Sequence, residues 1–147
     1  MLMIMNIDDL RYTCSLIEYI GRKTKNTRKS VVEALGEKYL NHILNHADVF
    51  HCEQIDEVAD RFIEACNIKL GDFDNVASCK YDVPNYWDIG EVYQRLISSL
   101  VLDDVISKLM EVYSSWITRY IDNYNIAVYY MTPEYLKLSY EEGKLLD

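Results

Sequence analysis

Apolar residues recur every three or four positions along most of the 147-residue chain, which is the spacing of one face of an α-helix. The first such run predicts an amphipathic helix over 4–22. Its apolar face carries Ile4, Ile7, Leu10, Cys14, Ile17 and Ile20. Runs over 31–47 and 55–66 repeat the pattern, and Ser30 with Glu33 predicts a capping box at the start of the first of them. Further helices are expected over 91–102, 103–120 and 124–130, and after Thr132 with Pro133 in the first helical position.

The stretches between these runs predict loops and turns. GRKTKNTRK at 21–29 is the one strongly basic stretch, and we expect it to be a solvated loop. Residues 67–71 predict a break, with Asn67 and Gly71 as turn residues. The pattern over 73–81 predicts a short helix, and 82–90 predicts a turn because the residue before a proline disfavours the helical conformation.

Length and composition agree with a helical fold. A chain of 147 residues with 50% hydrophobic residues is long enough for one buried core, so we expect a single domain over 1–147. Only five Gly and two Pro interrupt the chain, and no convincing period-two segment is present. The fold class predicted is all-α, with seven to eight short helices.

Charge and cysteine usage narrow the classes of partner. The formal net charge of −9 argues against nucleic acid and against an anionic membrane surface, and favours a basic or amphipathic partner. The four cysteines form no CxxC pair and lie in apolar stretches, which is typical of reduced core thiols inside cells. No apolar run approaches the length of a membrane span, and the N-terminal stretch does not have the pattern of a secretory signal. Thirteen tyrosines favour helix faces that are half buried or form an interface.

Few residues have a spacing that supports catalysis or metal binding. His42 and His46 are four residues apart and could hold a zinc ion, but the glutamate of HExxH is missing and no convincing fourth ligand follows. The other interpretation is two surface or half-buried histidines. Nucleotide-binding and nucleophile motifs are absent, and thiols on apolar stripes are poor nucleophiles. We therefore expect neither an enzyme nor a cofactor, and the metal-binding helical protein remains a third hypothesis.

An interaction surface is the remaining alternative for the apolar and aromatic residues. An amphipathic helix binds in a hydrophobic groove when two helices stand apart with apolar walls. The segments 31–50 and 55–76 are the candidates for these walls.

Four features together resemble the Bcl-2 fold proteins, particularly the diverged members from large cytoplasmic DNA viruses. Val31, Ala34 and Leu35 are similar to the start of the family's second helix. Val58 and Phe62 followed by IKLGDF at 68–73 resemble the first homology motif, and SSWI at 114–117 resembles the second. The separation of Gly71 from Trp116 is similar to that of the family's hairpin of two central helices.

The resemblance implies a Bcl-2-like bundle around a central hairpin that inhibits apoptosis. It would sequester the BH3 helix of pro-apoptotic Bcl-2 proteins, of the Bim type, in the host cytoplasm or at the mitochondrial surface. The implied groove residues are Val31, Leu35, Tyr39, Ile43, Val58, Phe62, Lys69, Leu70, Gly71, Asp72, Phe73 and Val76. Trp116 and Ile117 belong to the implied second homology motif.

Departures from the family pattern predict a narrow choice of ligand. Asp72 follows Gly71, where the family has an arginine that pairs with the invariant acid of the BH3 helix. Two acids facing each other repel, and Lys69 is the nearest substitute cation. The alternative function belongs to viral proteins of the same fold that block innate signalling adaptors, or self-associate through helix faces as a homodimer, without binding BH3 helices.

Overall fold

The computed structural model describes residues 6–101 and 103–147, and the regular elements in these ranges are all helical. Ile4 of the first apolar run lies outside the described residues. The elements are α1 (Ile7–Thr24), α2 (Arg28–Asn45), α3 (Ala47–Phe50), α4 (Ile55–Ala65), α5 (Tyr86–Leu100), α6 (Val105–Tyr113), α7 (Thr118–Ile121), the 3₁₀ helix η1 (Ala127–Tyr130) and α8 (Pro133–Glu142). The all-α prediction is therefore confirmed.

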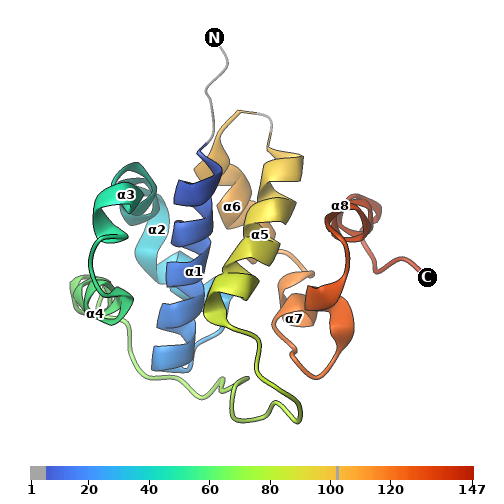
Figure 1. The fold of residues 1–147 in the computed structure, drawn as a ribbon, viewed down its shortest axis with the longest axis horizontal. Coiled ribbons are helices and arrows are strands. Elements are labelled where there is room, and N and C mark those ends of the chain that lie inside the picture. The colour runs from blue at the N-terminus through green and yellow to red at the C-terminus, as the bar shows by residue number, and fades with distance from the viewer. Residues whose placement is uncertain (1–5, 102) are drawn as a thin grey trace.

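Helix α1 is the most enclosed element of the bundle. Every residue from Tyr12 to Glu18 is buried, because α5 lies on one side of α1 while α2, α3 and α4 lie on the other (Figure 1). Side chains around the whole helix must then fit a packed environment, and the small residues Thr13 and Ser15 fill positions that look polar in the sequence. The helix was predicted as amphipathic with one apolar face, whereas the structure buries more than one face.

Helices α1 and α5 approach closely at Gly90. A Cβ atom built on this glycine would lie 2.0 Å from the hydroxyl oxygen of Ser15 and 2.8 Å from its backbone nitrogen. Asn85 caps α5 by accepting a hydrogen bond from the Trp87 N–H at 2.7 Å. The turn predicted over 82–90 therefore ends at Asn85, and the helix predicted over 91–102 begins at Tyr86, before its expected start.

The helical hairpin between Gly71 and Trp116 consists of α5 and α6 (Figure 1). Gly71 itself does not start a helix, and the short helix predicted over 73–81 is wrong, because 66–85 contains no helix. The backbone hydrogen bonds of this loop go elsewhere: Gly71 N–H donates to Thr24 O and Phe73 N–H donates to Lys25 O, both at 2.8 Å. Long-range pairing with the α1–α2 connection has replaced a local helix.

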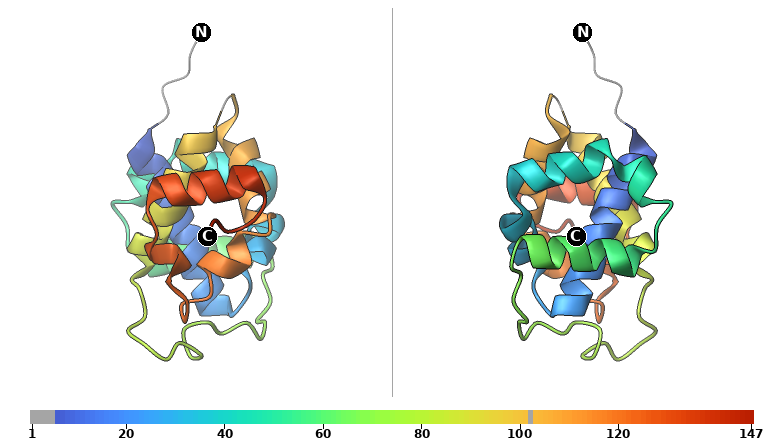
Figure 2. Two further views of the ribbon diagram at one scale, coloured as in Figure 1. Left: turned by 90° about the vertical axis from the view of Figure 1, so that its right-hand side faces the viewer. Right: turned by 90° about the vertical axis from the view of Figure 1, so that its left-hand side faces the viewer.

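Helix α2 is kinked at Gly36, which has φ 72° and ψ 171°. Only glycine adopts this backbone conformation readily. The kink sends the second half of α2 across the bundle, where it runs with α3 beside α4 on one face of the molecule (Figure 2). The sequence predicted an uninterrupted helix here.

The C-terminal third follows the predicted order with shorter pieces. The helix expected over 103–120 is divided into α6 and α7, with SSWI at 114–117 between them. Asp104 caps α6, which begins two residues after the predicted start at 103, and the segment 124–130 forms only η1. The predicted start of α8 is confirmed, because Pro133 is its first residue, and the Thr132 side chain caps the helix by accepting a hydrogen bond from Tyr135 N–H. Helix α8 then packs across α5, on the opposite side of the bundle from α4 (Figures 1 and 2).

We expect Gly90→Ala to lower the free energy of unfolding by about 3 kcal/mol, because the added Cβ overlaps the Ser15 backbone and the two helices must separate. Gly143→Ala is the matched control, since its Cβ meets open space and only its positive φ of 84° opposes the change, at about 1 kcal/mol. Urea denaturation of both variants measures the difference. Equal losses would show that the α1–α5 contact is looser than described.

Candidate functional site

The residues implied as groove walls are either buried in the core or packed against each other. Val31, Leu35, Ile43, Val58 and Phe62 are all buried. The half-buried ring of Tyr39 has its centroid 6.0 Å from that of Phe62, and the ring centroid of Phe50 lies 5.6 Å from that of Phe62. The space between the second half of α2 and α4 is thus occupied by the protein's own aromatic side chains.

Some of the residues implied as the groove rim are exposed to solvent, and others pack against the protein. Lys69, Leu70 and Asp72 are exposed, Leu70 by 73%. Gly71 packs against the α1–α2 connection, since a Cβ there would lie 2.3 Å from Asn26 Oδ1. Val76 is half buried against the core.

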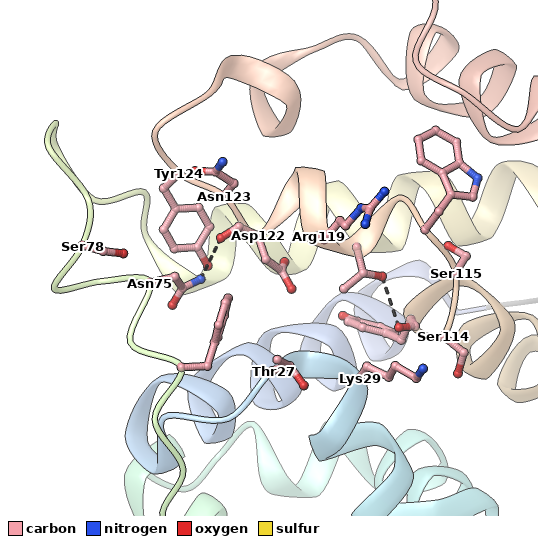
Figure 3. A pocket seen from close by; sticks show the side chains of 14 residues that line it. Thr27, Lys29, Asn75, Ser78, Ser114, Ser115, Arg119, Asp122, Asn123 and Tyr124 are labelled. Atoms are coloured by element: carbon pink, nitrogen blue, oxygen red, sulfur yellow. Dashed lines mark hydrogen bonds between the residues drawn. The ribbon is translucent and has the colours of Figure 1, made fainter.

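Phe73 and Trp116, which are distant in the sequence, line one cavity of about 680 Å³ (Figure 3). We call it the α6–α7 cavity, and Ile117 lies buried beside it. Its walls come from the start of α2, the loop 73–78 and the connection from α6 through α7. The lining residues are Thr27, Lys29, Phe73, Asn75, Ser78, Tyr113, Ser114, Ser115, Trp116, Thr118, Arg119, Asp122, Asn123 and Tyr124.

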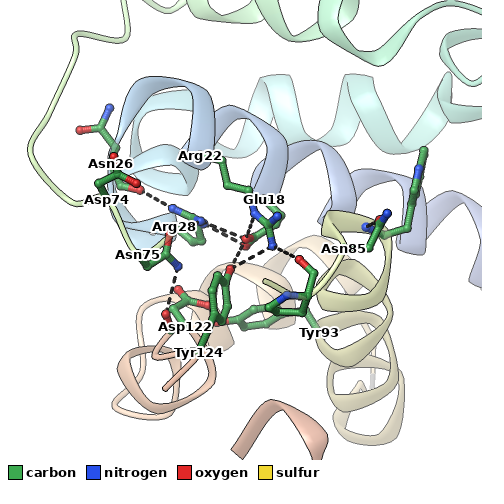
Figure 4. A network of polar contacts seen from close by, with 12 residues as sticks. Glu18, Arg22, Asn26, Arg28, Asp74, Asn75, Asn85, Tyr93, Asp122 and Tyr124 are labelled. Carbon is green, nitrogen blue, oxygen red and sulfur yellow. Dashed lines mark hydrogen bonds and ion pairs between the residues drawn. The ribbon is translucent and has the colours of Figure 1, made fainter. Parts of the chain in front are cut away.

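A network of buried charges lies next to this cavity, centred on Glu18 of α1 (Figure 4). Arg28 donates from Nε to Glu18 Oε1 and from its terminal nitrogen to Oε2, both at 2.9 Å, and neither side chain is more than 1% exposed. Arg22 donates to Glu18 Oε2 at 2.7 Å, and the Tyr124 hydroxyl donates to the same oxygen. Burial alone would raise the pKa of Glu18, but the charges and hydrogen bonds of Arg28 and Arg22 outweigh it and lower the pKa.

The network also reaches the long loop and the segment after α7. Arg28 donates to Asn75 Oδ1 at 3.0 Å, and Asn75 in turn donates to the backbone oxygen of Asp122 at 3.0 Å. The hydroxyl of Tyr93 on α5 donates to Asp122 Oδ1 at 2.8 Å. Burial and the nearby charge of Glu18 raise the pKa of Asp122 to about 7.

The prediction that 21–29 is a solvated basic loop is therefore wrong, because part of it is helical and Arg28 is buried. Helix α1 continues to Thr24, α2 starts at Arg28, and Arg28 is one of the most buried side chains of the molecule. Thr27 rather than Ser30 caps α2, by accepting a hydrogen bond from Ser30 N–H. Glu18 was missed as well, although a lone acid among buried apolar positions of α1 was the signal that could have identified it.

A second hollow, which we call the α5–α8 groove, has a volume of about 640 Å³. It is lined by the loop 81–85 and by residues of α5, η1 and the segment from Met131 into α8. The lining residues are Tyr81, Asp82, Val83, Pro84, Asn85, Asp88, Glu91, Val92, Arg95, Tyr129, Tyr130, Met131, Pro133 and Leu136. Large apolar side chains stay in solvent here, with Tyr81 exposed by 70% and Tyr130 by 80%.

Cysteine and histidine positions give no reactive cluster. Cys14 is buried as predicted, and burial raises the pKa of its thiol to about 12. Cys52 was also predicted to lie in the core, but it is exposed. The rings of His42 and His46 are exposed, with centroids 4.5 Å apart. Within 6–101 and 103–147, no group of three or more His, Cys, Asp or Glu is arranged to hold a metal ion.

Comparison with known proteins finds no match: no protein-family model, no curated protein and no solved structure matches the chain. In its described residues the chain is an all-helical protein whose α6–α7 cavity and α5–α8 groove accompany a buried charge network. In the described part of the chain, no helix combines the length and apolar character that crossing a membrane requires.

We expect the stability of the wild-type protein to depend on pH through Asp122. Its pKa is about 7 in the native state, well above the value of an unfolded aspartate, so the native state holds the extra proton between these two values. The resulting stabilisation is complete below the unfolded pKa and is lost as the pH rises through about 7. Asp122→Asn keeps an oxygen for Tyr93 and removes the titration, so relative to this variant the wild type loses about 2 kcal/mol or more from about pH 5 to about pH 8.

Denaturation of both proteins across this range measures the effect, with Asp72→Asn as the control at an exposed acid. Parallel pH profiles of wild type and Asp122→Asn would contradict the assignment of a raised pKa to Asp122.

Proposed function

We propose that this chain is a helix-binding protein of Bcl-2-like character that inhibits apoptosis by sequestering BH3 helices. The binding surface proposed is the α5–α8 groove. The observation that carries the proposal is the set of solvent-exposed apolar side chains gathered at this groove: Tyr81, Val83, Tyr130 and Met131. Exposed apolar side chains grouped along an open groove are typical of a surface that a partner covers.

The position of Gly90 supports a Bcl-2-like interpretation of α5. The first homology motif was assigned to Gly71, which lies in a loop. A glycine followed by a charged and a hydrophobic residue also occurs at Gly90, Glu91 and Val92, and there it lies in the first turns of a helix. Both Glu91 and Val92 line the α5–α8 groove, so the motif and the groove share one helix.

The charges at the groove determine which helices it accepts. Asp82 and Asp88 favour basic residues on the partner. Glu91 lies 3.2 Å from Arg95 and 3.4 Å from Arg11, so its charge is compensated by two arginines. Arg95 is more than half exposed and can pair with an acid of an incoming helix. A BH3 helix with basic residues beside its invariant acid is therefore the partner that fits, which agrees with a narrow choice of ligand.

The expected energy of this contact is sufficient for selective binding. Burying four apolar anchors of a helix supplies about 6–10 kcal/mol before the costs of association. The implied walls at 31–50 and 55–76 are already packed, so a helix binding there must first displace the ring of Phe62. The α5–α8 groove requires no such rearrangement.

We expect Val83→Glu and Met131→Glu each to weaken binding of a BH3 peptide by about tenfold or more, because a charge then faces the apolar side of the helix. Isothermal titration calorimetry with a panel of BH3 peptides measures the affinities. Ile7→Glu is the matched control, an apolar-to-acid change at a side chain 53% exposed outside the groove. Leu70→Glu tests the rim implied by the resemblance. If this variant loses peptide binding while Val83→Glu keeps full affinity, the helix binds between 31–50 and 55–76 and not in the α5–α8 groove.

We expect Arg95→Gln to weaken binding several-fold for a peptide that has the BH3 acid, and to leave a peptide with asparagine at that position unaffected. The reason is that the neutral side chain can no longer pair with the acid. A double-mutant cycle over protein and peptide measures the coupling. Equal losses for the two peptides would mean that Arg95 contacts another part of the ligand.

A Bcl-2-like protein that blocks innate signalling adaptors remains the alternative function. It predicts that no peptide of the BH3 panel binds, although the apolar groove is still required for contact with the adaptor.

A further inference from the structure

The two hollows differ in charge. Three acids and Arg95 line the α5–α8 groove, whereas Lys29, Arg119 and the single acid Asp122 line the α6–α7 cavity. The chain has a formal net charge of −9, so a cavity lined by two cations and one acid has the opposite sign of charge from the protein as a whole. Lys29 and Arg119 are exposed and form no ion pair with any of the described residues.

The polar groups of the cavity are separated into two ends. In the view of Figure 3, Asp122, Asn75 and Tyr124 lie toward one end, while Arg119, Lys29 and Ser114 lie toward the other. At the first end Asp122 can accept a hydrogen bond from a ligand, and at the second Lys29, Arg119 and the Ser114 hydroxyl can bind an anion.

Asp122 has one carboxylate oxygen in reserve for a ligand. The side chain is only 2% exposed, yet it lines the cavity. The hydroxyl of Tyr93 donates to Oδ1, and Oδ2 accepts no hydrogen bond from the rest of the described chain. Oδ2 is not among the buried side-chain atoms that lack a hydrogen-bond partner, so a ligand N–H group at this position would replace solvent as its donor when the carboxyl is ionised.

Aromatic rings form part of the cavity lining. Phe73, Tyr113 and Trp116 all line the cavity, and the Trp116 ring is held at 72° to that of Tyr120, with centroids 5.7 Å apart. Planar rings bind readily against such walls. The volume of about 680 Å³ lies within the usual range for small-molecule sites.

We propose that the α6–α7 cavity binds a small ligand in which a planar, nitrogen-containing ring is joined to an anionic group, as in a nucleoside monophosphate. Lys29 and Arg119 bind the anion, the aromatic residues of the lining contact the ring, and Asp122 accepts from one of its N–H groups. This site is separate from the α5–α8 groove and does not depend on helix binding.

The test uses the full chain with Trp87→Phe, which leaves Trp116 as the single tryptophan and therefore as the reporter of the cavity. Adenosine monophosphate, adenosine and inorganic phosphate are titrated separately, with fluorescence and calorimetry as readouts. We expect adenosine monophosphate to bind at least about tenfold more tightly than either fragment, because both ends of the cavity then contribute. Equal affinity for inorganic phosphate, or no binding of the monophosphate at millimolar concentration, would overturn the proposal.

Charge variants decide whether binding occurs in this cavity. Lys29→Gln with Arg119→Gln removes both cations and is expected to weaken adenosine monophosphate binding by about tenfold or more, with little effect on adenosine. Lys38→Gln with Lys144→Gln is the matched control, since it removes the same net charge at exposed positions outside the cavity. Equal weakening by both double variants would mean a diffuse electrostatic effect and would overturn the assignment. Weaker binding by the cavity double variant alone would support the assignment of the ligand to the α6–α7 cavity.

Discussion

The structure depends on the buried ion pair of Glu18 and Arg28. A buried charge is stable only when a partner compensates it, so the two residues hold α1 and the start of α2 in one relative position. The remaining hydrogen-bonding groups of Arg28 extend this constraint, because its other terminal nitrogen donates to Asn26 O at 2.8 Å. Glycine at position 21 gives the Arg28 side chain the space it occupies, since a Cβ at this position would lie 2.4 Å from it.

The same network positions the long loop 66–85, which has no regular structure of its own. Asn75 links the middle of the loop to Arg28, and Arg22 donates to Pro84 O at 2.7 Å near its end. The middle of the loop forms a wall of the α6–α7 cavity, and its end forms a wall of the α5–α8 groove. One set of buried charges therefore shapes both candidate sites.

Local patterns predicted much of the helical architecture. The 3.6-residue periodicity located α1, α4 and the core of α2, and the pair Thr132–Pro133 located the start of α8. These elements follow from residues within a few positions of each other, which a sequence displays directly.

The errors fall where distant residues decide the structure. The segment 73–81 has a helical pattern but bonds to the α1–α2 connection, and Arg28 in a basic run cannot be distinguished from its exposed neighbours without Glu18. Apolar periodicity also predicts burial without separating a groove from a core, so Val31 and Val58 were assigned to a binding surface and lie inside the bundle. The α5–α8 groove was missed because its walls come from two stretches that are distant in the sequence, 81–95 and 129–136.

The central claim is that a BH3 helix binds in the α5–α8 groove, and methyl-resolved NMR during titration with a BH3 peptide tests it most directly. We expect the methyl signals of Val83, Val92 and Leu136 to shift strongly, while those of Val31 and Val58 stay in place. Shifts confined to Val31 and Val58, or no shifts at all with every BH3 peptide, would contradict the account.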